Sequence, residues 1–569
     1  MGEFSEERVA AAAERAALIN ALQHETDAAV GPIMGPLMAD HPSFRSHADV
    51  VSEVVADAVA AVNAESMAWR RDRLAEIDPD ALAAIDAPAP SSGSPALPAL
   101  PDVDGPVRMR AAPNPNGPWH IGHARMPAVI GAYRERYDGH FTLRFDDTDP
   151  GTKRPDLSAY AAIEADLAYL GVTPDAVVRA SDRMEAYYTH AKEVIDAGGA
   201  YVCGCSAEAF STLKNAGDPC PHRGEPIPET HDRFAAMIDG AYQSGEAVLR
   251  IRTDIEHANP ALRDFVAFRM IDRPHPRPSA AAYRCWPMLD FQSAVDDHLL
   301  AISHIIRGID LQDSARRQRF IYDYLGWEYP TVLHWGHVNI DAYDVPLSTS
   351  AIAAAIDDGV LSGWDDPRAP TLRSLRRRGI EGAAIVESMV ELGMSTSNVD
   401  LPMSGIYAAN RARVDPSAPR AFLVREPVQL HVSGLSAQVE VARHPEDATM
   451  GVRTIGVSDA VALEAQDIPE EGARVWLKGA GCVRREGDEL VGTGEPIDVV
   501  RSGQVDVVHW APADGRAVHM ETPEGGISGV APPPLAQVEE DTVVQFERVG
   551  FARIDAQEPT RTVAYFAHR

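Results

Sequence analysis

Lysine is almost absent from this chain of 569 residues. Of its 52 basic residues, four are lysine (Lys153, Lys192, Lys214 and Lys478), so the other 48 are arginine, against 84 acidic residues and a net charge of −32. In ordinary salt such a charge would argue against a nucleic-acid partner. In molar salt the Debye length falls to about 3 Å, and dense surface carboxylates repel one another much less. We therefore expect a halophilic protein in which local arginine clusters must be judged separately.

Other scarcities exclude further classes of protein. Five cysteines are too few for a disulfide scaffold, and no apolar run reaches the roughly 18 residues of a membrane span. The first ten residues are acidic and lack the basic and apolar regions of a signal peptide, so we expect a cytoplasmic protein with no membrane partner. Apolar residues make up 45% and charged residues 24%, which disfavours wholesale disorder.

Composition and periodicity divide the chain into five predicted segments. Alanine-rich helical spacing comes first, followed by a stretch rich in Pro, Ser and Gly. Strands and helices then alternate as in a parallel α/β domain, a short helical region follows, and the rest consists of short alternating strands that predict an all-β barrel. The segments are a helical module (1–86), a linker (87–106), an α/β domain (107–345) with an insertion at about 200–285, a helical region (346–405) and a β region (406–569).

The strongest chemical signal follows the first predicted strand of the α/β domain. His120 and His123 are three residues apart at a helix start and so share one face, with Gly122 leaving room between them. A helix N-terminus offers free N–H groups and a positive dipole end to a phosphate. We predict a nucleotide-binding loop at Pro113, Asn114, Pro115, Asn116, Gly117, Pro118, Trp119, His120, Ile121, Gly122 and His123.

His-Ile-Gly-His after such a strand resembles the nucleotide site of class I aminoacyl-tRNA synthetases. Flanking motifs narrow the resemblance to the glutamyl/glutaminyl branch, and to its archaeal-type glutamyl-tRNA synthetases in particular. The resemblance implies a Rossmann-like catalytic domain, a helical stem-contact module and a C-terminal β-barrel that binds the anticodon. The flanking motifs that carry this resemblance are residues 110–113, 143–150, 286–291, 304–308, 364–368, 371–380, 509–512 and 544–548.

The resemblance also implies roles for three substrate-binding residues. Arg110 would bind the substrate carboxylate, Asp146 its amino group, and Arg307 would lie near its far end. Arginine suits a carboxylate because its planar fork can reach both oxygens. Leu289 stands where glutaminyl relatives carry a tyrosine that touches the substrate, which favours glutamate over glutamine.

The second signature of the class, a Lys-x-Ser-Lys-Ser loop, is degenerate. It has Pro346 and Thr349 at the two lysine positions. Ser348, Thr349 and Ser350 can still hold phosphate through hydroxyl and N–H groups, or they can simply cap the following helix. If the loop binds ATP, charge neutralisation of pyrophosphate must come from Mg²⁺ or from an arginine.

Cys203, Cys205, Cys220 and His222 form two close pairs of soft or borderline ligands. This set suits tetrahedral Zn²⁺, although C-x-C and C-x-H are tighter than the commoner spacing. Free thiols in a loop are the alternative.

Arginine clusters in an acidic chain are candidates for RNA contact. Arg376, Arg377 and Arg378 form such a cluster, for which the alternative is a solvated helix face paired with nearby acids.

The function implied by the resemblance is a glutamate–tRNA ligase. Glutamate and ATP would give glutamyl-adenylate and pyrophosphate, and the terminal ribose of tRNA(Glu) would then take the acyl group. Charging of tRNA(Gln), the assembly state (we expect a monomer) and the role of the first 86 residues stay open. The alternatives are a glutaminyl-tRNA ligase, a small-molecule nucleotidylyltransferase using the same loop, and an inactive RNA-binding relative.

Overall fold

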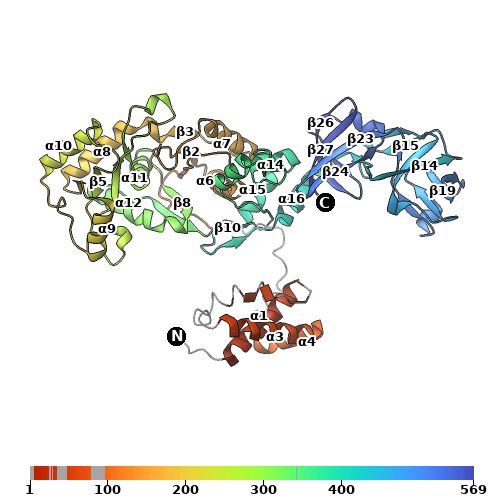
Figure 1. Ribbon diagram of the computed structural model, residues 1–569, viewed down its shortest axis with the longest axis horizontal. Helices are drawn as coiled ribbons and strands as arrows, with labels where there is room; N and C mark the ends of the chain where they lie inside the picture. The colour runs from red at the N-terminus through yellow and green to blue at the C-terminus, as the bar shows by residue number, and fades with distance from the viewer. Residues whose placement is uncertain are drawn as a thin grey trace. The chain divides into compact units, whose positions relative to one another are not determined.

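A computed structural model describes residues 6–24, 27–28, 30–31, 33–34, 37, 48–78, 97–340 and 342–569. The chain divides into two compact units, 1–96 and 97–569 (Figure 1). Across the described ranges, no helix is both long enough and apolar enough to cross a membrane.

In the first unit, the described residues include three helices of more than ten residues, α1 (Glu6–His24), α3 (Ala48–Asn63) and α4 (Met67–Ile77). α1 packs against both others through a core that includes Val9, Leu18, Val55 and Leu74. Their apolar residues recur at helical spacing, which is why each helix has one face to bury.

The predicted linker, 87–106, lies only partly within the described residues. Residues 97–106 have no helix or strand, yet Leu97 and Leu100 are buried in the main core of the second unit. Tyr133 donates a hydrogen bond to the carbonyl of Pro98 at 3.0 Å. Residues 97–106 are therefore part of the second unit and are not a free linker.

Parallel strands form the framework of the α/β region. β1 (Arg108–Ala111), β2 (His140–Phe145) and β3 (Ala176–Arg179) pair in that order, and β8 (His304–Gly308) pairs with β9 (Thr331–Trp335). The backbone N–H of Ser303 donates to Arg108 at 2.9 Å, which places β8 beside β1. Since carboxyl ends of parallel strands meet at one edge, the residues that end these strands converge. The helices that follow β1 and β2 are α6 (Arg125–Tyr137) and α7 (Leu157–Tyr169).

The segment of the chain between β3 and β8 forms a second sheet, flanked by helices. Its four strands form an antiparallel sheet with its own aromatic core, which includes Tyr188, Phe268 and Trp286. The elements are α8 (Met184–Asp196), β4 (Ala200–Cys203), α9 (Ala207–Ala216), α10 (Ile227–Ile238), β5 (Val248–Ile251), β6 (Val266–Met270), β7 (Cys285–Pro287) and α11 (Leu289–Leu299), and α12 (Gln312–Leu325) follows β8.

Short helices connect the α/β region to the strands beyond it. A side chain at Gly382 would collide with the carbonyl of Tyr169, so the start of α15 can meet the end of α7 only through a glycine. The elements are β10 (Val338–Asn339), α13 (Thr349–Asp357), α14 (Leu372–Arg378), α15 (Gly382–Glu391), β11 (Val399–Asp400) and α16 (Met403–Val414).

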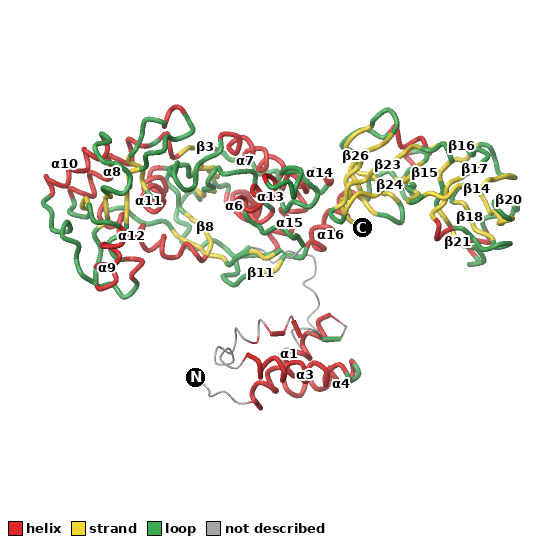
Figure 2. The backbone as a smooth tube through the Cα atoms, viewed as in Figure 1, coloured by secondary structure: helices red, strands yellow, loops and turns green. Residues whose placement is uncertain are grey.

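The regular structure of the C-terminal part is almost all strand, joined by loops (Figure 2). Two seven-stranded sheets, ordered β12-β25-β26-β27-β23-β24-β13 and β21-β18-β19-β20-β14-β17-β22, each bury one face, as the period-2 alternation predicts. The strands are β12 (Arg420–Ala421), β13 (Val424–Arg425), β14 (Pro427–Ser433), β15 (Gln438–Ala442), β16 (Val452–Gly456), β17 (Ala460–Glu464), β18 (Arg474–Leu477), β19 (Gly481–Glu486), β20 (Glu489–Gly492), β21 (Asp506–Val508), β22 (Ala511–Pro512), β23 (Arg516–Thr522), β24 (Gly525–Ala531), β25 (Val543–Phe546), β26 (Gly550–Gln557) and β27 (Arg561–His568), with one short helix α17 (Asp498–Arg501).

Candidate active site

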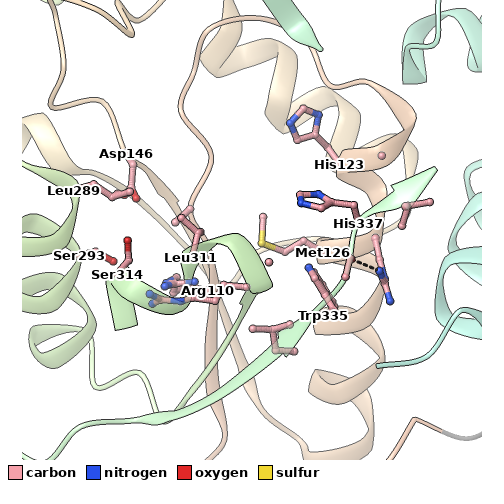
Figure 3. A pocket seen from close by; sticks show the side chains of 18 of the residues that line it. Arg110, His123, Met126, Asp146, Leu289, Ser293, Leu311, Ser314, Trp335 and His337 are labelled. Atoms are coloured by element: carbon pink, nitrogen blue, oxygen red, sulfur yellow. Dashed lines mark hydrogen bonds between the residues drawn. The ribbon is translucent and has the colours of Figure 1, made fainter. Parts of the chain in front are cut away.

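A cavity of about 300 Å³ opens where β1, β2, β8 and β9 end. Arg110 on β1, Asp146 directly after β2 and Arg307 on β8 all line it, although the sequence separates them by up to 197 residues. In Figure 3, Asp146 lies on one side of the cavity and His123 on the other. The three residues that the resemblance assigns to the substrate therefore face one space.

A buried carboxylate from α11, that of Asp297, lies behind these arginines. Its Oδ1 is 3.0 Å from Nε of Arg110 and 2.7 Å from Nη1 of Arg144. Nη2 of Arg307 is farther away, at 4.0 Å from Oδ2. Burial opposes ionisation of Asp297, but the neighbouring arginines outweigh it and hold the pKa at about 2.

Arg144 also orients the carboxylate of Asp146. Its Nε lies 2.7 Å from Oδ1 of Asp146, and Nε2 of Gln292 donates to the same oxygen at 3.1 Å. Burial raises the pKa of Asp146, and Arg144 and Arg110 counter that effect. This carboxylate is thus fixed in place at the cavity wall, where it can accept hydrogen bonds from an ammonium group.

Arg307 carries the least neutralised positive charge of the cluster. Its side chain is 5% exposed and its Nη1 donates to Oε1 of Gln318 at 3.2 Å, whereas Nε and Nη2 have no hydrogen-bond partner within the described part of the chain. Asp296 also lies within 3.8 Å of Arg144, but its charge is balanced by Arg183 at 2.6 Å. The other groups of the cluster are three arginines (Arg110, Arg144 and Arg307) and two carboxylates (Asp146 and Asp297), which leaves one excess positive charge. The cavity therefore suits an anion whose carboxylate reaches Arg307.

The histidine loop runs from the end of β1 into α6 and is held by backbone contacts. Ile121 donates to the carbonyl of Pro370, and Leu372 donates to that of Trp119. The rings of His120 and His123 lie 3.8 Å apart between centroids. Burial lowers the pKa of His120 to about 4 and that of His123 to about 3, so both rings are neutral at physiological pH.

Of the eleven predicted loop residues, Gly122 and His123 line the cavity directly. Asn114 instead braces the loop, because its Nδ2 donates to the carbonyl of Asp146 at 3.0 Å. A Cβ added at Gly117 would come within 2.6 Å of Thr349 Cγ2, so the two predicted ATP loops touch at this point. Thr349 begins α13, and Ser348 Oγ lies 3.0 Å from Ser350 Oγ.

The four predicted zinc ligands come together where β4 ends and α9 begins. The sulfur atoms of Cys203 and Cys220 are 3.5 Å apart, and those of Cys205 and Cys220 are 3.7 Å apart. Nδ1 of His222 lies 3.5 Å from the sulfur atoms of both Cys205 and Cys220. All four ligand atoms lie within 4.8 Å of one another, which is compatible with a tetrahedral site whose Zn–S bonds measure about 2.3 Å.

The predicted RNA-binding arginines of α14 do not behave as one patch. Arg378 is 2% exposed and donates to the carbonyls of Phe566 and Ala567, which fastens α14 to β27, so its prediction as an RNA contact is wrong. Arg377 makes ion pairs with Asp555 and Asp365. Arg376 is exposed and lines a groove together with Arg373.

Sequence reasoning missed Arg144, Asp297 and Gln318. One signal was present for Arg144, because it lies on β2 two residues before Asp146, and residues two apart in extended chain point to the same side. The other two come from helices that follow or flank distant strands, and no spacing reports their position.

The buried histidines predict how stability depends on pH. Below pH 6.5 the unfolded chain protonates His120 and His123, whereas the folded chain does not until about pH 4 and 3, so stability falls as the pH falls through this window. The Nδ1 atoms are buried, although the residues are partly exposed. These pKa values correspond to about 5 kcal/mol for the pair between pH 7 and 4.5, and partial exposure of both residues reduces that figure. Over this range the His120→Gln/His123→Gln variant should therefore lose at least about 2 kcal/mol less stability than the unaltered protein.

Chemical denaturation in molar KCl at a series of pH values measures this difference. Other buried groups, such as Asp166 with its pKa raised to about 6, titrate in both proteins and cancel in the comparison. Parallel stability curves for the two proteins would contradict the assignment.

Comparison with known proteins identifies the family. A model of the catalytic domain of class I tRNA synthetases (E and Q) matches residues 106–416, and one of their anti-codon binding domain matches residues 418–501. Proteins named glutamate–tRNA ligase are similar over their full length in Natronomonas pharaonis (57% identity, all of both chains) and Haloarcula marismortui (56%, all of both chains).

A third such protein, from Haloquadratum walsbyi, is 56% identical over 99% of this chain and 98% of its own. A solved glutamate–tRNA synthetase from Elizabethkingia anophelis is more distant, with 18% identity and a TM-score of 0.38 over 55% of this chain and 71% of that one. The family matches and the full-length relatives from halophilic archaea confirm the resemblance that the motifs indicated. The chain belongs to the glutamate–tRNA ligase family of class I aminoacyl-tRNA synthetases.

Proposed function

We propose that the chain is a glutamate–tRNA ligase, which activates glutamate with ATP and transfers it to the 3′ end of tRNA(Glu). The observation that carries the proposal is the cavity beside the histidine loop, with one excess positive charge and unpartnered donors on Arg307. Glutamate has two carboxylates and one ammonium, so its charge of −1 complements this cavity. Glutamine would leave the excess charge uncompensated.

The cavity walls suggest how glutamate is oriented. Asp146 accepts from the ammonium, Arg110 binds one carboxylate and Arg307 the other. Asp297 already occupies part of the hydrogen-bonding capacity of Arg110, so Arg307 is the stronger free site. No side chain is required as a nucleophile, since holding the attacking carboxylate in line with the α-phosphate supplies much of the rate enhancement.

The histidine loop contacts the ATP phosphates in this proposal. His123 faces the cavity as a neutral ring and donates a hydrogen bond to the charge that develops on the α-phosphate. Ser348, Thr349 and Ser350 hold the outer phosphates through hydroxyl and backbone N–H groups, without the two signature lysines. Mg²⁺ supplies neutralisation of the leaving pyrophosphate when it is bound.

Acylation of purified tRNA in molar KCl tests the function. We expect charging of tRNA(Glu) with glutamate and a kcat/KM for glutamine lower by about 100-fold or more, because an amide cannot neutralise Arg307.

The His123→Ala variant should form adenylate about 100- to 1,000-fold more slowly while binding tRNA normally.

Three other outcomes separate the alternatives. Preferential charging with glutamine would make the protein a glutaminyl-tRNA ligase. Nucleotidyl transfer that needs no tRNA would favour a small-molecule transferase, and absence of turnover with intact tRNA binding would indicate an inactive relative. Parallel assays with tRNA(Gln) decide whether that tRNA is also a substrate.

We also infer a structural zinc at Cys203, Cys205, Cys220 and His222. Three thiols and one imidazole suit Zn²⁺, and their contacts leave the sulfur atoms of Cys203 and Cys220 buried against each other. The cluster links β4 to the turn before α10, so a bound ion would restrain the α9 segment between them.

The purified protein should contain about one zinc per chain. Cys205→Ser should lose the ion, and its α9 segment should become more sensitive to protease, whereas Cys482→Ser, at a thiol outside the cluster, should retain it. Elemental analysis and limited proteolysis measure both effects. Metal-free protein prepared without chelators would remove the zinc proposal and leave the ligase proposal unaffected.

For the tRNA, we propose contact with the exposed donors of α14 and anticodon binding by the strands after residue 418. Arg373 and Arg376 line a groove between α7, α14 and β25–β26. Guanidinium groups there can pair with phosphate, and molar salt weakens the repulsion from the acidic surface.

Substitutions at two arginines of α14 should change different properties of the protein. Arg376→Gln should raise the KM for tRNA roughly fivefold without changing stability, because it removes one charge-assisted contact. Arg378→Gln should instead lower the free energy of unfolding by about 3 kcal/mol, because buried carbonyls lose their donors. Acylation kinetics at high KCl and thermal unfolding distinguish the two, and an unchanged tRNA constant for Arg376→Gln would return that residue to a solvated surface role.

A further inference from the structure

The orientation of Arg307 depends on one neutral side chain, Gln318 on α12. Gln318 is 1% exposed and also lines the cavity. Its Oε1 accepts from Nη1 of Arg307 at 3.2 Å and from the hydroxyl of Tyr329 at 2.8 Å. These contacts hold one arm of the guanidinium and leave Nε and Nη2 without partners among the residues that the structure describes.

The chemistry of the two donors fixes which amide atom faces them. An arginine can only donate, so the atom of Gln318 that meets it must be the carbonyl oxygen. Burial raises the pKa of Tyr329 to about 12, so its hydroxyl keeps its proton and can donate as well. The amide dipole of Gln318 therefore points its negative end at Arg307 without neutralising its charge.

A carboxylate at this position would have a very different effect. It would share the geometry of the amide, form a full ion pair with Arg307 and cancel the excess positive charge of the cluster. Asp297 cannot do this, since it lies 4.0 Å from Arg307 and already pairs with Arg110 and Arg144. The remaining charge in the cavity thus depends on residue 318 being neutral.

We propose that Gln318 is a positioning residue that orients Arg307 and leaves its charge free, so that the cavity selects a substrate carboxylate over an amide. The inference rests on the proposed function and adds to it a determinant of selectivity that does not itself touch the reacting atoms. Charge and orientation are separable, because an apolar residue of similar size removes the acceptor without adding an anion.

Tests use the full chain in molar KCl, with steady-state acylation of tRNA(Glu) at varied glutamate, glutamine and ATP. Gln318→Glu should raise the KM for glutamate at least 30-fold, lower the glutamate-to-glutamine ratio of kcat/KM at least tenfold and leave the KM for ATP within twofold. Gln318→Met should raise the KM for glutamate about three- to tenfold with kcat nearly unchanged and most of the discrimination retained. Gln312→Glu is the matched control, because it makes the same change on the same helix at an exposed position outside the cavity.

Several results would overturn the inference. These are a KM for glutamate within twofold of the unaltered protein in Gln318→Glu, an equal rise in the KM for ATP, or equal effects of the Gln312 and Gln318 changes. If Gln318→Glu fails to fold, as judged by thermal unfolding, the split between KM and kcat in Gln318→Met decides. Absence of glutamate charging by the unaltered protein would instead refute the proposed function, so the two failures are distinguishable.

Discussion

The buried carboxylate of Asp297 forms ion pairs with arginines from two adjacent strands and faces a third arginine from another strand. Arg110, Arg144 and Arg307 come from β1, β2 and β8, and without an anion among them three like charges would repel in a space that water cannot screen. Removing one member of such a cluster typically costs several kcal/mol, because the remaining charges stay buried and uncompensated. The cluster therefore fixes both the shape of the cavity and the sign of its charge.

The same cluster explains how a site assembled from distant segments becomes specific. Asp297 takes part of the donor capacity of Arg110, and Arg144 donates to both Asp146 and Asp297, so these two arginines have fewer donors left for a substrate. Of the three arginines, Arg307 is the one whose buried donors, Nε and Nη2, lack a hydrogen-bond partner among the described residues, and its one close partner, Gln318, is uncharged. Selectivity for an anion thus arises from what each arginine has already bound, as much as from how many arginines there are.

Part of this site could be predicted from the sequence. The histidine loop is local, and Arg110, Asp146 and Arg307 lie on or directly after strands whose carboxyl ends must meet in a parallel arrangement. Asp297 and Gln318 could not be found in this way. Their roles depend on how α11 and α12 pack against those strands, and a helical position gives no indication of which distant side chain it will face.

In the arginine cluster at 376–378, by contrast, two local patterns in the sequence predict different surroundings for the same residue. Leu372, Leu375 and Arg378 are three residues apart and share the buried face of α14, so the apolar spacing already predicted that the last arginine points inward. Charge suggested solvent or RNA, but periodicity was the better guide to burial. A buried arginine is tolerated there because carbonyls of β27 and the hydroxyl of Tyr407 accept from it.

Near-exclusive use of arginine gives the chain two electrostatic regimes. Arg125, held by the carbonyls of Gly336 and Gly393 and stacked over Trp335, illustrates the buried one: a planar group with five donors can tie several segments together, which the single ammonium of lysine cannot. Salt barely reaches such contacts, whereas at molar concentration it screens the exposed carboxylates that bring the net charge to −32. The buried contacts can then keep the same geometry at any salt concentration, whereas the fold tolerates its charged surface only when salt screens it. An acidic protein can keep a positively charged cavity on these terms, because the groups that make the cavity positive are those that the surrounding salt screens least.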